Sequence, residues 1–218
     1  MKKNVLSFSI FALMILMLAS CASSKKVAYF QNAVDGVVKR SEGLYDAKIM
    51  PKDISEIIQV VDLDGAYIPH DCILFDPDLT EEESPLYTDT SINCVDVEKI
   101  VRRNKQKREN LNDLSSRKTI KVKAQTKPYS VYYFSSNLDL FLHHNANLDY
   151  RQKVALADSF SSEFIGDVDG FIRTISEDPG AVNGMTYDES WSFIKDGKNS
   201  LGRHTNLNIL LNKLLSEE

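Results

Sequence analysis

The sequence predicts an α/β domain with a helix-rich C-terminal half, preceded by a leader that is cleaved off. The chain has 218 residues, 43% of them hydrophobic and 26% charged, which is the composition of a globular protein. A short apolar strand at 57–61 ends in two aspartates and a glycine, and from residue 138 onward apolar residues recur at helical spacing. Val5–Leu18 is a continuously apolar stretch, too little for a multi-span membrane protein.

Residues 1–20 have the pattern of a secretory signal peptide. Lys2 and Lys3 precede the apolar run, which is shorter than the roughly 20 residues that cross a bilayer. The following Leu-Ala-Ser-Cys resembles the lipobox of bacterial lipoproteins, in which the cysteine receives a diacylglycerol and becomes an acylated amino terminus after cleavage. The resemblance implies lipidation at Cys21 and a membrane as partner through that anchor. Residues 22–24 contain no acidic residue, which favours the outer membrane.

Residues 21–53 carry a second resemblance. Tyr29-Phe30-Gln31 and the Tyr-Asp-x-x-Ile-x-Pro-x-Asp pattern at 45–53 resemble the start of the Wza-like polysaccharide export lipoproteins of Bacteroides-type bacteria. This implies a tether at 21–53 and polysaccharide-export components as partners. The pattern does not continue after Asp53, so we expect a hybrid chain joined near this residue, either by natural fusion or by gene assembly.

Opposite charges are concentrated in neighbouring blocks. Residues 53–97 contain 12 acidic and no basic side chains, whereas residues 98–128 contain 11 basic and 3 acidic ones. One interpretation is a solvated loop followed by a solvated helix. The alternative is a basic helix face for phosphate or another polyanion, with Arg102 and Arg103 as anion-binding residues. Arg203, in a turn before the last helix, is a further anion-binding candidate.

The remaining elements follow in chain order. Asp96 is expected to cap a helix over 97–114, because apolar residues recur there every three or four positions. Alternation predicts a strand at 119–124, and β-branched and aromatic residues predict a buried strand at 129–134. Helical spacing between glycine stops predicts the last five helices: 138–144, 150–164, 167–176, 187–196 and 207–215. The domain as a whole is placed at 54–218.

Asp62 and Asp64 follow the strand at 57–61. In an extended chain, residues two apart face the same side, so both carboxylates would lie at the carboxyl end of a strand, where α/β sheets bind ligands. Paired carboxylates suit Mg²⁺, which completes its shell with water and substrate phosphate. The sequence therefore predicts Asp62 and Asp64 as Mg²⁺ ligands. The alternative is an ordinary turn at a strand end.

This order of elements resembles the Toprim fold, especially its RloB-like branch, which is linked to restriction and phage-defence loci. In that branch an Asp-x-Asp strand end is followed by a helix and then by a strand that opens into a Ser-Asn-Pro-x-Phe-Glu-Leu-Trp-like helix. Here Asp62-Leu63-Asp64 precedes the basic helix, and Ser-Asn-Leu-Asp-Leu-Phe at 136–141 is similar, with Asp139 in place of glutamate. The resemblance spans 54–215 loosely. It implies a partial Toprim-like, Rossmann-like sheet with Asp62, Asp64 and Asp139 as catalytic residues.

A Toprim site also uses an acidic residue on an earlier strand-helix turn, and the leader stands in its place here. We therefore expect an incomplete α/β domain with little or no catalysis. A lipid anchor outside the cytoplasm would also separate such a domain from nucleic acid. Nucleic acid is an expected partner only if the leader is misassigned and the protein is cytoplasmic.

Asp-Leu-Asp-Gly at 62–65 also resembles the first motif of the haloacid dehalogenase-like phosphatases, Asp-x-Asp-Gly-Thr, with Ala66 in place of threonine. In that case Asp62 would be the nucleophile and Asp64 the general acid. Ser135 or Ser136, at the end of a strand, would supply the hydroxyl of the second motif, and Asp167 or Asp169 would serve as later metal ligands. The alternative functions are therefore a Mg²⁺-dependent phosphodiester or phosphate-ester hydrolase and a non-enzymatic accessory of polysaccharide export.

Overall fold

The computed structural model describes residues 54–216, so the predicted signal peptide, the lipidation site Cys21 and the tether lie outside the described residues. Within them the chain is mixed α/β, with two small sheets and six α-helices, which confirms the α/β class. The described chain divides into two compact units. One contains residues 54–61 and 109–131, and the other contains residues 62–108 and 132–216.

The first unit contains most of a three-stranded sheet in the order β1-β6-β5. Its strands are β1 (Ile57–Asp62), β5 (Thr119–Val122) and β6 (Gln125–Phe134). β5 and β6 are antiparallel. The Tyr129 hydroxyl donates a hydrogen bond to the Gln59 side chain, so this buried polar pair is satisfied. The strand predicted at 119–124 is shorter than expected, because the chain turns at Lys123 with a φ of +53°.

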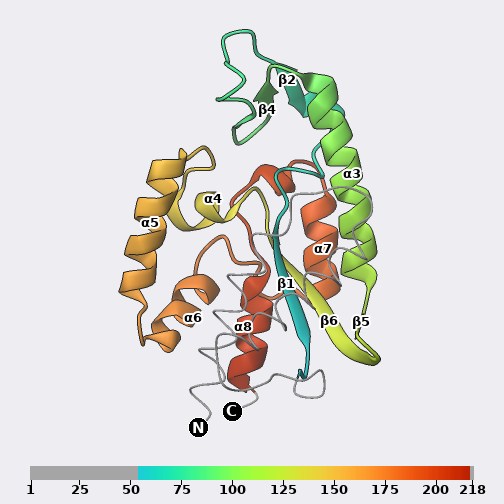
Figure 1. The fold of residues 1–218 in the computed structure, drawn as a ribbon, viewed down its shortest axis with the longest axis vertical. Coiled ribbons are helices and arrows are strands. Elements are labelled where there is room, and N and C mark those ends of the chain that lie inside the picture. The colour runs from blue at the N-terminus through green and yellow to red at the C-terminus, as the bar shows by residue number, and fades with distance from the viewer. Residues whose placement is uncertain (1–53, 217–218) are drawn as a thin grey trace. The chain divides into compact units, whose positions relative to one another are not determined.

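The second unit contains a small sheet in the order β2-β4-β3. Its strands are β2 (Ile73–Phe75), β3 (Leu86–Tyr87) and β4 (Ile92–Cys94), with β2 parallel and β3 antiparallel to β4. Figure 1 shows β2 and β4 beside the first turns of α3 (Val97–Ser116). The prediction of a solvated loop over the acidic block is therefore wrong for these strands, because Ile73, Ile92 and Cys94 pack in a buried cluster.

The six predicted helices are confirmed, and their ends differ from the prediction by one or two residues. After α3 they are α4 (Leu138–His143), α5 (Tyr150–Glu163), α6 (Val168–Ser176), α7 (Tyr187–Lys195) and α8 (Leu207–Ser216). Short 3-10 turns lie at η2 (His70–Cys72) and η3 (Asn199–Leu201). The first five helices begin where a side chain accepts a hydrogen bond from the first turn: Asp96, Asn137, Asp149, Asp167 and Thr186.

The end of β6 is held by buried polar contacts within the second unit. The Tyr133 ring packs edge-on against Trp191 at 5.1 Å between centroids. Asn206, fully buried, accepts a hydrogen bond from the Tyr133 N–H at 2.8 Å and donates to the Ser190 hydroxyl at 3.0 Å. Thr205 forms an antiparallel bridge with Phe134. These contacts fix where β6 ends and therefore where the following turn at 135–137 lies.

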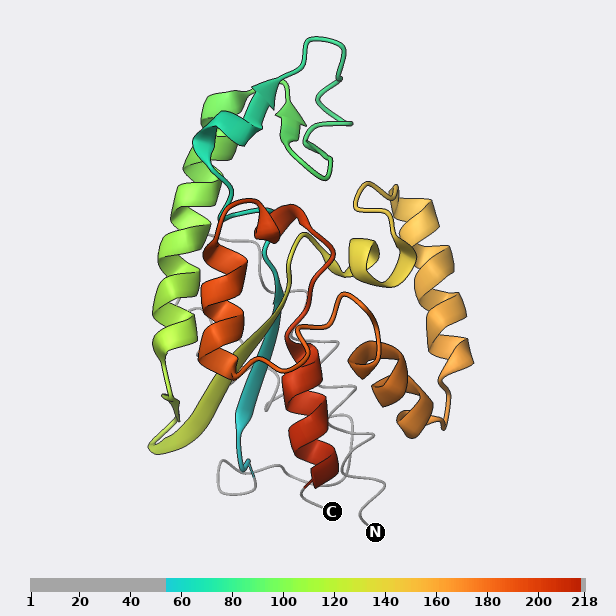
Figure 2. The same ribbon diagram turned by 180° about the vertical axis from the view of Figure 1, so that it is seen from behind.

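Figures 1 and 2 both show α4, α5 and α6 grouped together in the second unit. None of the helices between residues 54 and 216 is long and apolar enough to cross a membrane.

Candidate functional site

The ends of β1 and β6 are joined through the backbone and through Asp62. The Leu63 N–H donates to the Phe134 carbonyl at 2.9 Å, and the Asp64 N–H donates to the Ser136 carbonyl at 2.7 Å. Oδ1 of Asp62 accepts a hydrogen bond from the Leu138 N–H at 3.0 Å, at the first residue of α4. The last residue of β1 therefore contacts the helix that follows β6.

Asp64 lies in a turn and does not continue the strand. β1 ends at Asp62, and Asp64 and Gly65 have left-handed φ values of +50° and +63°. The expectation that strand alternation places the two aspartates side by side is therefore wrong in its geometry. Glycine suits position 65, because a Cβ there would lie 2.8 Å from a Leu201 methyl group and the φ is unfavourable for other residues.

Two cations from α3 reach this turn. Lys107 forms an ion pair with Oδ2 of Asp64, and both side chains are partly exposed. Arg103 donates to the Asp64 carbonyl at 3.0 Å and to the Tyr87 hydroxyl at 2.9 Å. Arg103 and Lys107 are four residues apart, so one face of the helix carries both. Of the two arginines predicted on this helix, Arg103 lies at the turn, whereas Arg102 is exposed.

Asp139 is the second residue of α4. Its carboxylate forms an ion pair with Lys153 of α5, 2.9 Å between the charged atoms. The Asp139 charge also acts on Asp62, where it raises the pKa. The structure therefore brings all three predicted carboxylates, Asp62, Asp64 and Asp139, into one electrostatic neighbourhood.

The pKa of Asp62 is raised from 3.8 to about 7. Burial of the carboxyl is the largest cause, followed by the negative charge of Asp64. Lys107 and the hydrogen bond from Leu138 act in the opposite direction. At neutral pH the Asp62 carboxyl therefore lies near the midpoint of its titration, and an added cation would favour the ionised form.

Asp62 and Asp64 could supply two carboxylate ligands to a divalent cation. Within residues 54–216 no cluster of three or more histidine, cysteine or acidic side chains could hold a metal ion. Mg²⁺ is commonly held by one or two carboxylates and several waters. An ion bound by Asp62 and Asp64 would compete with Lys107 for the Asp64 carboxylate.

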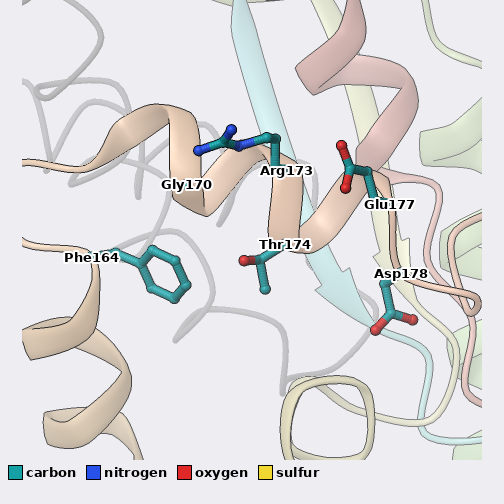
Figure 3. Close-up of a pocket in the computed structure, with 6 residues that line it drawn as sticks. All are labelled: Phe164, Gly170, Arg173, Thr174, Glu177 and Asp178. Carbon is teal, nitrogen blue, oxygen red and sulfur yellow. The ribbon is translucent and has the colours of Figure 1, made fainter.

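Arg203 lies at a different place in the second unit. Its guanidinium pairs with Asp178 and donates to the Phe141 carbonyl at 3.0 Å. Asp178 lines an open cavity of about 500 Å³ with residues of α6 and with Phe164, and Figure 3 shows these side chains. None of the three predicted catalytic aspartates lines this cavity. The charge of Arg203 is already balanced by an internal carboxylate.

Of the residues expected from the phosphatase resemblance, Ser135 and Asp167 form hydrogen bonds that stabilise the fold. Ser135 donates to the Gly202 carbonyl and accepts a hydrogen bond from the His204 N–H at 2.8 Å. Asp167 caps α6 by accepting the Gly170 N–H at 2.9 Å, and Asp169 lies in the first turn of that helix. Ser136, buried beside Asp64 in the backbone pairing, has a hydroxyl without a hydrogen-bond partner in the described residues.

Sequence reasoning placed Lys107 on the basic helix without relating it to the aspartates, and it missed Tyr87 and Lys153. The four-residue spacing of Arg103 and Lys107 was a signal that both face the same neighbour. No local pattern relates Tyr87 or Lys153 to the aspartates, because each lies far from them in the chain.

The chain matches no protein-family model, no curated protein and no solved structure.

Proposed function

We propose that residues 54–216 form a Toprim-like domain of the RloB-like branch that binds a divalent cation at Asp62 and Asp64 and interacts with a phosphate ester. The supporting observation is the grouping of Asp62, Asp64 and Asp139 at the ends of β1 and β6, next to two cations from α3. The order of motifs in the sequence, an Asp-x-Asp strand end, a basic helix and a strand that opens into a helix, also supports the proposal. A bound Mg²⁺ would supply positive charge to phosphate oxygens, with Asp62 and Asp64 as its protein ligands.

We expect this site to bind metal and phosphate but to catalyse little or no reaction. Asp139 is paired with Lys153, and Asp64 is paired with Lys107. A carboxylate held by an internal cation is a weaker metal ligand, because the ion must displace that cation. The domain is therefore proposed to bind metal and phosphate with little or no turnover.

The domain is also proposed to be attached to the outer membrane through a lipid on Cys21, with the segment 21–53 as a tether that docks to polysaccharide-export components. The sequence patterns at 18–21 and 45–53 support this part. Lipid labelling and membrane fractionation of the tagged chain test it, with Cys21→Ala as the matched variant. A lipidated, membrane-bound wild type and a soluble variant are expected. An unlipidated wild type in the cytosol contradicts the anchor.

The metal site is tested by Mg²⁺ calorimetry and Mn²⁺ titration of the full-length chain in detergent. Asp64→Asn should weaken binding at least about tenfold, because it removes one of two charged ligands. Asp113→Asn is the control, since Asp113 is an exposed carboxylate of α3 whose partner is Arg117. Equal affinity in wild type and Asp64→Asn, or no binding to the wild type at millimolar Mg²⁺, contradicts the proposal.

A further inference from the structure

The sheet β2-β4-β3 of the second unit has two edges, which differ in how far the described residues cover them. At the β3 edge, the Tyr87 N–H donates to Oδ1 of Asn147, and Nδ2 of Asn147 donates to the Tyr87 carbonyl, both at 2.8 Å. The Asn147 amide therefore takes the place of a neighbouring strand. At the other edge, β2 has β4 as its one neighbouring strand within residues 54–216.

The outer side of β2 presents backbone groups of Phe75. Along a strand in a parallel ladder, alternate residues direct their N–H and C=O groups to the neighbouring strand. The Asp76 N–H donates to the Cys94 carbonyl of β4 at 3.0 Å. Phe75, one residue earlier, therefore directs its N–H and C=O groups away from β4. Such an edge is a template for pairing with another extended chain.

Two large apolar side chains of β2 are exposed beside this edge. Leu74 is 46% exposed and Phe75 is 63% exposed, whereas the preceding Ile73 packs in the buried cluster. One residue therefore anchors the strand to the core, and the next two face solvent. An exposed apolar strand at a sheet edge favours the docking of a further strand.

The chain around β2 carries negative charge that no internal cation pairs with in the described residues. Residues 71–96 contain eight acidic side chains and no lysine or arginine. None of these carboxylates forms an ion pair within residues 54–216. Asp71 precedes β2 and Asp78 follows it, and both are exposed. This charge favours a partner with lysine or arginine and disfavours a second copy of the same acidic edge.

We infer that β2 is a docking site for an extended peptide segment in which lysine or arginine alternates with apolar residues. The segment adds a strand to the sheet and pairs with the backbone of Phe75. Its apolar side chains lie against Leu74 and Phe75, and its cations lie near Asp71 and Asp78. Main-chain hydrogen bonds supply the affinity, and the side chains supply the specificity. This surface lies apart from the aspartates, so the inference goes beyond the proposed function.

The test is fluorescence anisotropy of the full-length chain in detergent with a labelled heptapeptide that alternates lysine and valine. A peptide with proline in place of valine is the control for charge, because it carries the same cations and its prolines have no N–H to donate. The lysine–valine peptide should bind at least about tenfold more tightly than the proline peptide. Its binding should weaken as salt rises. Hydrogen exchange of the Phe75 N–H should slow when the lysine–valine peptide is bound.

Exposed residues allow substitutions that leave the core intact. Phe75→Ser should weaken peptide binding at least about fivefold, because it removes an apolar contact. Ile165→Ser is the matched control, since Ile165 is 78% exposed elsewhere in the second unit. Asp78→Asn should weaken binding about twofold, as expected for one exposed ion pair. Asp158→Asn, at an exposed carboxylate of α5, should leave binding unchanged.

Equal affinity for the two peptides would show that charge alone attracts them, and this overturns the inference. Absence of binding at millimolar lysine–valine peptide overturns it as well, as does an equal loss of binding in Ile165→Ser and Phe75→Ser. A dimer in analytical ultracentrifugation that Phe75→Ser dissociates would assign the edge to a second copy instead. Unchanged peptide binding in Asp64→Asn supports a surface that is independent of the aspartate site.

Discussion

The backbone N–H of Leu138 donates a hydrogen bond to Oδ1 of Asp62 over 3.0 Å, which links the last residue of β1 to the first residue of α4. This bond stabilises the ionised carboxylate, whereas burial and the charge of Asp64 destabilise it. The destabilising contributions dominate, so the protonation of Asp62 should be visible in the stability of the protein.

We expect the free energy of unfolding to fall as the pH rises from about 4 to about 7. Below pH 4 the Asp62 carboxyl is protonated in both states. Between pH 4 and 7 the unfolded chain releases the proton while the folded chain retains it, because the folded pKa is about 7. The fall is at most about 1.4 kcal/mol per pH unit and ends above pH 7.

Asp62→Asn should remove this dependence, because the amide has no charge to bury and its oxygen can still accept the Leu138 N–H. Urea unfolding, monitored by the fluorescence of the single tryptophan Trp191, measures the free energy of unfolding at each pH. The same pH slope in the variant would show that Asp62 titrates normally in the folded protein.

Removal of Lys107 should strengthen divalent-cation binding. Its ammonium group occupies the Asp64 carboxylate, so Lys107→Gln leaves that ligand free for an ion. A gain of about fivefold in Mg²⁺ affinity is expected, since a partly exposed ion pair contributes about 1 kcal/mol. The titration belongs at pH 8.5, because Lys107 also lowers the pKa of Asp62 and its loss would leave more of that carboxyl protonated at pH 7. Arg117→Gln is the control, and a weaker Mg²⁺ affinity in Lys107→Gln contradicts the prediction.

Cys72 and Cys94 should remain free thiols under oxidising conditions. Both are buried and unbridged. Cys94 lies opposite Phe75 in the parallel ladder. Phe75 is three residues along the chain from Cys72. That offset is about 10 Å along a strand, which exceeds the roughly 7 Å that a disulfide spans between Cα atoms.

Mass spectrometry after diamide treatment of the Cys21→Ala chain should therefore recover two thiols, and maleimide should label both only after urea is added. A peptide cross-linked between Cys72 and Cys94 would contradict the register of β2 and β4.

Asn206→Ala should destabilise the fold by about 2–3 kcal/mol. The side chain accepts from the buried Tyr133 N–H, and its loss leaves this N–H without that partner. The Ser190 hydroxyl loses the donor that Asn206 supplies but still donates to the Tyr187 carbonyl. Asn212→Ala is the matched control, because Asn212 is exposed on α8 and alanine favours a helix. Chemical unfolding measures both. A change below about 0.5 kcal/mol in Asn206→Ala would show that Asn206 does not hold the end of β6.

Local patterns were sufficient for the helices and for three of the strands, β1, β5 and β6. A cap such as Asp96 followed by apolar residues every three or four positions specifies a helix without reference to the rest of the chain. The short strands β2, β3 and β4 were not predicted, because two or three residues are too few for alternation to stand out within an acidic segment.

The sequence by itself determined the α/β class, the helices and the candidates Asp62, Asp64 and Asp139, because caps, periodicity and motif spacing are local. Only the tertiary structure decided what surrounds these aspartates. Lys107 is 43 residues from Asp64 in the chain, and Lys153, on the next helix, pairs with Asp139 of α4. The pairing of distant charges and the burial that raises the pKa of Asp62 depend on how helices and strand ends pack, and no local pattern encodes that packing.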